Sequence, residues 1–143
     1  MADSRRDRLF GRWLPLVVWA AAIYALSSRP VVPHVGPKLN ETDYLFDYLA
    51  HAAEFALLCW LAWRAFRGSA VSWLSRRPAL WAAVFSAAYA ALDEAHQAFV
   101  PGRMATLPDW LADITGAALV ALAVGLWERY ENQRTTPHRS EQG

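Results

Sequence analysis

The sequence predicts an all-α protein made of four transmembrane helices, with the N-terminus and the C-terminus on the cytoplasmic side. Of its 143 residues, 55% are hydrophobic and 19% are charged, which fits one domain and is too apolar for a disordered chain. Charged residues are missing from four stretches, namely 13–28, 48–63 apart from Glu54, 78–92 and 114–127. Positive residues concentrate in alternate connections, and seven tryptophans lie near the ends of the stretches, as is typical of membrane interfaces.

The length of the stretches leaves one alternative to a membrane fold. They have 14 to 16 residues, whereas a hydrocarbon core about 30 Å thick requires roughly 20. On length alone they are also compatible with buried helices of a soluble bundle. The first stretch and most of the third are apolar around the whole helix, however, while a helix of a soluble bundle keeps a polar face. Membrane spans are therefore favoured, with their missing length supplied by flanking polar residues.

The first span is expected from Trp13 to about Ser27, after a basic cytoplasmic arm over residues 1–12. It ends before Pro30, because proline lacks an amide donor and restricts the residue before it. The basic arm, the apolar run and the small residues Ala25 and Ser27 also fit a cleavable signal peptide. Two tryptophans and a proline within the run favour retention, as does the even number of crossings that keeps both basic ends inside.

Three further helices complete the expected membrane domain of residues 13–129. They are expected over residues 44–66, from 78 to about 99, and from 106 or 107 onwards, with a short interfacial turn at 71–74. Residues 130–143 are predicted to form a polar cytoplasmic tail that is frayed from residue 131. The arm, the connection between the second and third stretches and the tail hold eleven positive residues, and the other two connections hold three. This asymmetry places both termini inside.

Each of the last three helices carries one polar seam at helical spacing. His51 and Glu54 lie on the first of these helices, and Asp109 and Asp113 lie four residues apart on the last. With the termini inside, all three seams fall in the outer half of the membrane. We expect one polar pocket that is open to the exoplasmic face and roofed by the connection that carries Arg103. Its predicted ligand-binding residues are His51, Glu54, Asp93, Glu94, Gln97, Arg103, Asp109 and Asp113.

Energy favours pairing within this pocket. An ionised side chain at the middle of a membrane costs about 2.5–3.5 kcal/mol on insertion scales, so these groups should pair, become protonated or face water. Arg103 is expected to form a salt bridge to Asp93, Glu94 or Asp109, and Glu54 is expected to orient His51. The alternative is that the seams only provide hydrogen bonds between helices, at roughly 0.6 kcal/mol each.

Several of these residues belong to a recognisable pattern. Residues 91–103 read ALDEAHQAFVPGR and residues 109–116 read DWLADITG, after SSRP at 27–30 and D-x-x-x-H-x-x-E-F at 47–55. This order resembles the signature of the VanZ-like integral membrane proteins, with one departure at Tyr48, where many relatives have lysine. The resemblance implies a multi-pass protein of the bacterial cytoplasmic membrane. It also implies a role in the cell envelope or in resistance to the glycopeptide antibiotic teicoplanin, with which the founding member is linked.

Three functions remain open on this evidence. In the first, the pocket binds a lipid-linked or cell-envelope head group, with Arg103 and His51 meeting phosphate or carboxylate and the acidic residues accepting hydroxyl or amine donors. In the second, a metal-dependent hydrolase or transferase of a lipid head group holds Mg²⁺, Mn²⁺ or Zn²⁺ through His51, Glu54, Asp93, Glu94 and Asp113. In the third, a small proton-coupled transporter relays protons through the same groups and functions as an oligomer.

Composition limits the partners. The net charge of +1 provides no basic field, so no nucleic-acid partner is expected. The expected partners are the lipid bilayer, a lipid-linked envelope ligand and, as an open alternative, a second copy of the chain. No cofactor is assigned beyond the divalent cation of the hydrolase hypothesis. Cys59 is the single cysteine and is expected to be a small buried hydrophobic residue.

Overall fold

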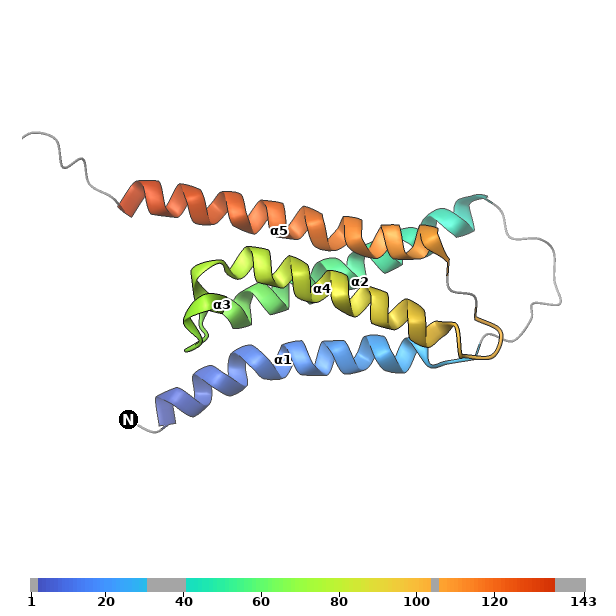
Figure 1. Ribbon diagram of the computed structural model, residues 1–143, viewed down its shortest axis with the longest axis horizontal. Coiled ribbons are helices and arrows are strands. Elements are labelled where there is room, and N and C mark those ends of the chain that lie inside the picture. The colour runs from blue at the N-terminus through green and yellow to red at the C-terminus, as the bar shows by residue number, and fades with distance from the viewer. Residues whose placement is uncertain (1–2, 31–40, 104–105, 136–143) are drawn as a thin grey trace, which may run out of the picture.

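The computed structural model describes residues 3–30, 41–103 and 106–135, with the backbone alone for 3–9 and 41–44. Its helices are α1 (Asp3–Ser27), α2 (Glu41–Arg67), α3 (Ser72–Arg76), α4 (Pro78–Gln97) and α5 (Leu107–Thr135). The four long helices run alternately in opposite directions, and α3 joins α2 to α4 (Figure 1). No strand occurs in these residues, so the all-α prediction is confirmed.

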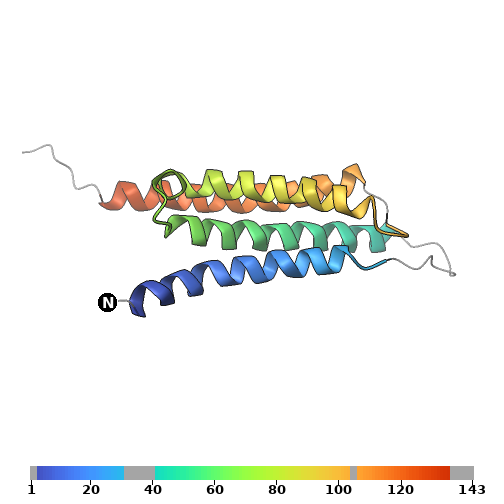
Figure 2. The same ribbon diagram turned by 60° about the horizontal axis from the view of Figure 1, so that its bottom comes forward.

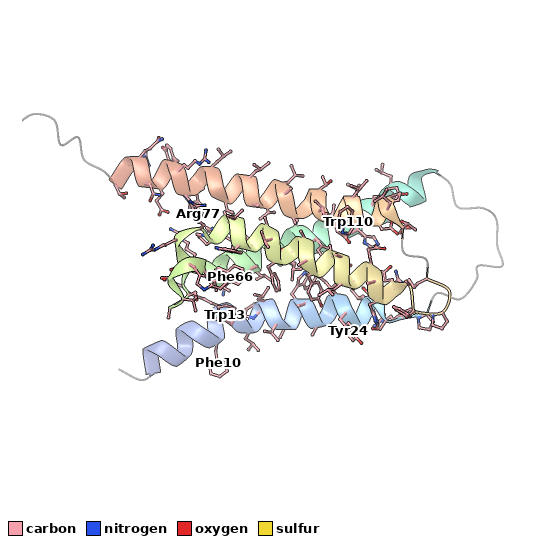
Figure 3. The ribbon with its side chains drawn as sticks, viewed as in Figure 1. Phe10, Trp13, Tyr24, Phe66, Arg77 and Trp110 are labelled. Atoms are coloured by element: carbon pink, nitrogen blue, oxygen red, sulfur yellow. The ribbon has the colours of Figure 1, made fainter. Side chains whose placement is uncertain are left out.

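The alternating directions give the bundle two distinct ends. We call "loop end" the end where α1 and α4 finish and α5 begins, and "arginine end" the end where α1 begins, α2 finishes and α5 finishes (Figure 1). Tyr24 and Trp110 are labelled toward the loop end, whereas Phe10, Trp13, Phe66 and Arg77 are labelled toward the arginine end (Figure 3).

The central helix of the bundle is α2, which packs against α1, α4 and α5 (Figure 2). Phe55, Leu58, Ala62 and Phe66 of α2 are buried at spacings of three and four residues, which is the repeat of one helix face. Cys59 is also fully buried and free, as predicted. Because α1 lies on the side of α2 that faces away from α5, the two outer helices make no direct helix contact.

The backbones of α2 and α5 approach most closely at Gly116. A Cβ atom at this position would overlap the backbone of Ala52 on α2. Only glycine therefore permits this approach, as small residues do where membrane helices pack closely. The approach sets the spacing of the polar side chains nearby.

Three helices are long and apolar enough to cross a membrane: α1 over Phe10–Ser27, α2 over Leu45–Arg67 and α5 over Leu107–Thr135. Leucines such as Leu14, Leu119 and Leu122 are exposed on these helices, as lipid-facing residues are. The sequence predicted four spans, but α4 is not among those that qualify by length and composition. The reason is composition rather than length: α4 has 20 residues, but most of its apolar residues are alanine, and Asp93 and Glu94 lie near its end.

Two helix ends differ from the prediction. Helix α1 starts at Asp3, so the basic segment expected as a separate arm forms its first turns, and no proline interrupts it before Pro15. Helix α5 continues to Thr135, so residues 131–135 are helical rather than frayed. Contacts with α2 explain this extension, because Arg67 forms an ion pair with Glu131 at 2.6 Å and the Trp63 indole donates to Glu128 Oε1 at 2.7 Å. The interfacial turn predicted at 71–74 corresponds to α3.

Candidate functional site

The polar seams of α2, α4 and α5 meet near the loop end. We call "polar cluster" the set of His51, Glu54, Asp93, Glu94, Gln97, Asp109 and Asp113. Electrostatic interactions connect Glu54 with His51, Asp93 and Asp113. They also connect Glu94 with His51, Asp109 and Asp113. The six titratable residues therefore lie near one another, and Gln97 joins them through its hydrogen bond to Asp93.

One pair links α2 to α5 within the cluster. His51 Nδ1 lies 3.1 Å from Asp113 Oδ1, and the Asp113 side chain is fully buried while that of His51 is 20% exposed. The close approach at Gly116, one turn along α5 from Asp113, brings the two side chains together. The prediction that Glu54 orients His51 was wrong, because Asp113 bonds to its ring nitrogen. The second oxygen of Asp113, Oδ2, is buried and has no hydrogen-bond partner among the described residues.

A second link joins α1 to α4. Ser27 Oγ lies 2.8 Å from Asp93 Oδ2 and 3.0 Å from the carbonyl oxygen of Ile23, so its single proton has two acceptors, and Gln97 Nε2 donates to Asp93 Oδ2 at 2.9 Å. Asp93 is 5% exposed, so these donors take the place of water around a buried carboxylate. Ser27 was not among the predicted pocket residues. The sequence does hold a signal for Ser27. It lies shortly before the proline that ends the first helix, which places its hydroxyl at the same end of the bundle as the polar seams.

A serine and a histidine also meet at the loop end. Ser28 Oγ lies 3.0 Å from His96 Nε2, and the His96 ring lies 4.7 Å from that of Tyr24. Such a pair resembles the nucleophile and base of covalent catalysis. Here, however, Ser28 Oγ donates its proton to the carbonyl oxygen of Tyr24 at 2.7 Å. A hydroxyl has one proton, so while Ser28 donates to the Tyr24 carbonyl it does not donate to His96, and the pair then requires the Nε2–H tautomer of His96.

Arg103 interacts electrostatically with Glu54 but forms its hydrogen bonds with backbone carbonyls rather than with a carboxylate. Its guanidinium donates to the carbonyl oxygens of Leu26 at 3.1 Å and Arg29 at 3.4 Å. These carbonyls lie at the end of α1, where helix carbonyls have no partner within the helix and attract cations. Among the described residues Arg103 forms no ion pair with Asp93, Glu94 or Asp109, so the predicted salt bridge was wrong. Arg103 instead fastens the α4–α5 connection to α1.

Glu94 lies on an open groove at the loop end. Its Oε2 accepts a hydrogen bond from the backbone amide of Thr106 at 3.0 Å, and its Oε1 is buried without a partner among the described residues. The groove holds about 400 Å³ and is lined by Ala91, Glu94, Thr106, Leu107 and Trp110. Thr106 Oγ1 in turn accepts from the Asp109 amide at 3.3 Å, which caps the start of α5. Through this groove Glu94 reaches the surface, and His51, Glu54 and Asp109 are also partly exposed.

The cluster does not assemble a recognisable metal-ligand group. In the ranges that the structure describes, no three His, Cys, Asp or Glu side chains come together in a way that could hold a metal ion. The five groups named for the divalent cation are near one another, but their oxygens and nitrogen bond to protein partners or remain apart. Their arrangement thus supplies hydrogen-bond acceptors rather than a coordination shell.

Comparison with known proteins agrees with the pattern seen in the sequence. The family model described as VanZ/LLP1 matches residues 6–128, which include the polar cluster, all of α2 and α4 and most of α1 and α5. Neither the curated proteins nor the solved structures gave a match. Because the family model covers most of the chain and three helices can cross a membrane, this chain is a membrane protein that belongs to the VanZ/LLP1 family.

Proposed function

We propose that this protein binds a lipid-linked or cell-envelope head group through the groove at Glu94 and the polar cluster behind it. The observation that carries the proposal is the pair of buried carboxylate oxygens without partners, Glu94 Oε1 and Asp113 Oδ2. A buried acceptor that lacks a donor costs about 1–3 kcal/mol, and more when it is charged. A ligand that brings hydrogen-bond donors removes this cost, so the proposed head group carries an ammonium or hydroxyl group.

The groove fits such a ligand. Glu94 supplies the acceptor, and the indole of Trp110 provides an aromatic face of the kind that attracts ammonium groups. Leu107 and Ala91 line the same groove and match the apolar part of a lipid-linked molecule. Two of the five N–H donors of Arg103 bind backbone carbonyls at the end of α1, and Arg103 does not line the groove, so the proposal does not rest on a phosphate contact. We therefore retain the prediction that the acidic residues accept hydrogen bonds from hydroxyl or amine groups of the ligand. We do not retain the prediction that Arg103 binds phosphate or carboxylate.

The proposal includes a topology. All four long helices, α4 included, cross the bacterial cytoplasmic membrane, with the arginine end inside and the loop end outside. The alternating helix directions support this arrangement. The distribution of positive residues supports it as well, since they concentrate at the arginine end. Glu94 and its groove then lie at the outer interface, where envelope precursors carry their head groups.

The two other hypotheses receive less support. Metal-dependent hydrolysis lacks a ligand group in the described residues. Proton transport requires a relay across the membrane, whereas Ser86 is the one buried polar side chain described between the cluster and the arginine end. A metal assay and loss of function on chelation would revive the first hypothesis. Proton uptake into proteoliposomes would revive the second.

The binding proposal is tested by Glu94→Gln and Asp113→Asn, which remove the negative charges with little change in shape. Protein purified in mild detergent is mixed with phosphatidylethanolamine, which has an ammonium group, or with phosphatidylcholine, which cannot donate hydrogen bonds from its head group. Native mass spectrometry counts the bound lipid. We expect the wild type to prefer phosphatidylethanolamine and both variants to lose the preference, by about tenfold for one charge-assisted hydrogen bond of about 1.5 kcal/mol.

Asp47→Asn is the matched control, because Asp47 is an exposed acidic residue of α2 outside the cluster. It should retain the preference of the wild type. Equal binding of both lipids by the wild type, or equal preference in all four proteins, would contradict the proposal. A cellular role, including teicoplanin resistance, is tested by expressing the same variants in a deletion strain and measuring growth in the presence of the antibiotic.

A further inference from the structure

A second groove lies between α4 and α5, in the half of the bundle nearer the arginine end. It holds about 510 Å³ and its lining includes Ala79, Ala83, Ala118, Ala121, Gly125 and Arg129. Apart from Arg129, its lining is apolar. We propose that this groove binds one anionic phospholipid, with an acyl chain between α4 and α5 and the phosphate at Arg129. The site is separate from the polar cluster and goes beyond the proposed head-group function.

The length of the groove favours an acyl chain over a protein helix. Ala118 and Arg129 delimit it along α5, and at 1.5 Å per residue they are about 16 Å apart. That is about half of a hydrocarbon core about 30 Å thick, or the depth of one leaflet. A packing helix would use the whole span, whereas a lipid chain ends at the middle of the membrane.

The charge at one end of the groove points to the head group. Arg129 is exposed and makes no hydrogen bond, ion pair or aromatic contact with any described residue. Two other arginines at this end are engaged: Arg67 pairs with Glu131, and Arg134 lies over the Tyr130 ring. A guanidinium without a partner at the membrane surface suits a lipid phosphate, which it can bind through two parallel hydrogen bonds.

The same charge disfavours a second copy of the chain as the occupant. A two-fold symmetric dimer would place the same surface patch of both copies face to face. The two Arg129 side chains would then approach each other without a counter-ion, and like charges repel at such an interface. Small side chains along the groove also permit helix association, so the test must be able to detect a dimer.

The test uses the full chain in mild detergent, titrated with phosphatidylglycerol or with zwitterionic phosphatidylcholine and followed by native mass spectrometry. We expect one tightly bound phosphatidylglycerol per chain. Arg129→Gln should weaken it about fivefold, the effect of one basic residue near an anionic head group. Arg134→Gln is the matched control, since it removes a charge near the same end but outside the groove, and it should bind as the wild type does.

A second pair of variants tests the acyl-chain part. Ala118→Leu fills the groove, whereas Ala123→Leu adds the same volume at an exposed alanine of α5 outside it. Only the first should lose the lipid, and both should melt like the wild type in detergent. Unchanged lipid binding in Arg129→Gln, or an equal loss in Arg134→Gln, would overturn the proposal. A lipid-free dimer that Ala118→Leu disrupts would assign the groove to a second copy instead. Glu94→Gln should bind phosphatidylglycerol normally, which separates this outcome from failure of the head-group proposal.

Discussion

At the residue scale, the central interaction is the bond between His51 and Asp113. The two oxygens of Asp113 have different surroundings: Oδ1 meets the imidazole and Oδ2 meets no described donor. One oxygen of the carboxylate is thus held by the protein, and in the proposed complex a ligand donor must reach the other, which is fully buried. Its position behind the Glu94 groove suits a group that recognises a ligand without moving.

Removing His51 should lower the stability of the protein, because Asp113 then has no hydrogen-bond donor among the described residues. His51→Ala leaves both oxygens of a fully buried aspartate without a donor, so we expect a loss of about 1–3 kcal/mol in stability. The check is thermal unfolding of the detergent-purified protein. The double variant with Asp113→Ala should recover part of the loss, because it also removes the unpaired carboxylate. Additive effects of the two substitutions would show that the side chains do not interact.

At the scale of elements, the pairing of α2 with α5 depends on Gly116. The polar side chains meet because the two backbones approach at Ala52, and the longer links through Trp63 and Arg67 hold the same two helices together at the arginine end. Helix α1 is attached differently. The Tyr89 hydroxyl donates to the Ala20 carbonyl at 2.7 Å, and the Trp19 indole donates to the Glu54 carbonyl at 3.0 Å. These are single bonds to backbone atoms, and among the described residues side-chain links such as Ser27 to Asp93 join α1 to α4 only at the loop end.

Gly116→Ala tests the approach of α2 and α5. The added Cβ overlaps the Ala52 backbone, so α5 must move outward and carry Asp113 away from His51. We expect a lower unfolding temperature and loss of the lipid preference described for Glu94→Gln. Gly125→Ala is the control on the same helix, because its Cβ would lie at an ordinary 3.7 Å from the Ala79 Cβ. It should be neutral or stabilising by roughly 0.5–1 kcal/mol, the usual advantage of alanine within a helix. Equal effects of the two substitutions would contradict this account.

At the scale of the whole molecule, the charge-free stretches were enough to predict an all-α fold and the order of its helices. The i, i+4 spacing was enough to predict that the acidic residues and His51 converge, because helices aligned in one bundle place such seams at a common depth. Individual partners were not predictable in this way. Glu54 is near His51 in sequence, but Asp113 is nearer in space. Arg103 binds a backbone carbonyl of α1, and because every residue has such a carbonyl, a pattern of residue types does not reveal this partner. The predictions for His51 and for Arg103 were wrong for the same reason: an acceptor distant in sequence bonds to the side chain in place of the acceptor that the sequence suggested.

The proposed topology predicts the result of reporter fusions. Alkaline phosphatase, which is active only outside the cytoplasm, should be active when fused after Gly36 or after Arg103. It should be inactive after Ser69 or Gln142, where a cytoplasmic fluorescent reporter should work instead. Because α4 is the helix that does not qualify by length and composition, the fusions after Ser69 and Arg103 are decisive. If both report the same side, α4 does not cross the membrane.

The separation between His51 and Asp113 has a consequence for biosynthesis. The two residues are 62 positions apart in the sequence, so α2 leaves the ribosome and enters the translocon long before its acidic partner exists. During that interval the imidazole of His51, and later the carboxylate of Asp93 on α4, must remain near the aqueous vestibule of the translocon or form temporary hydrogen bonds with other groups. Maturation of the bundle therefore awaits the last helix, and nascent chains released before α5 would be recognisable to quality-control proteases by their unmatched polar groups.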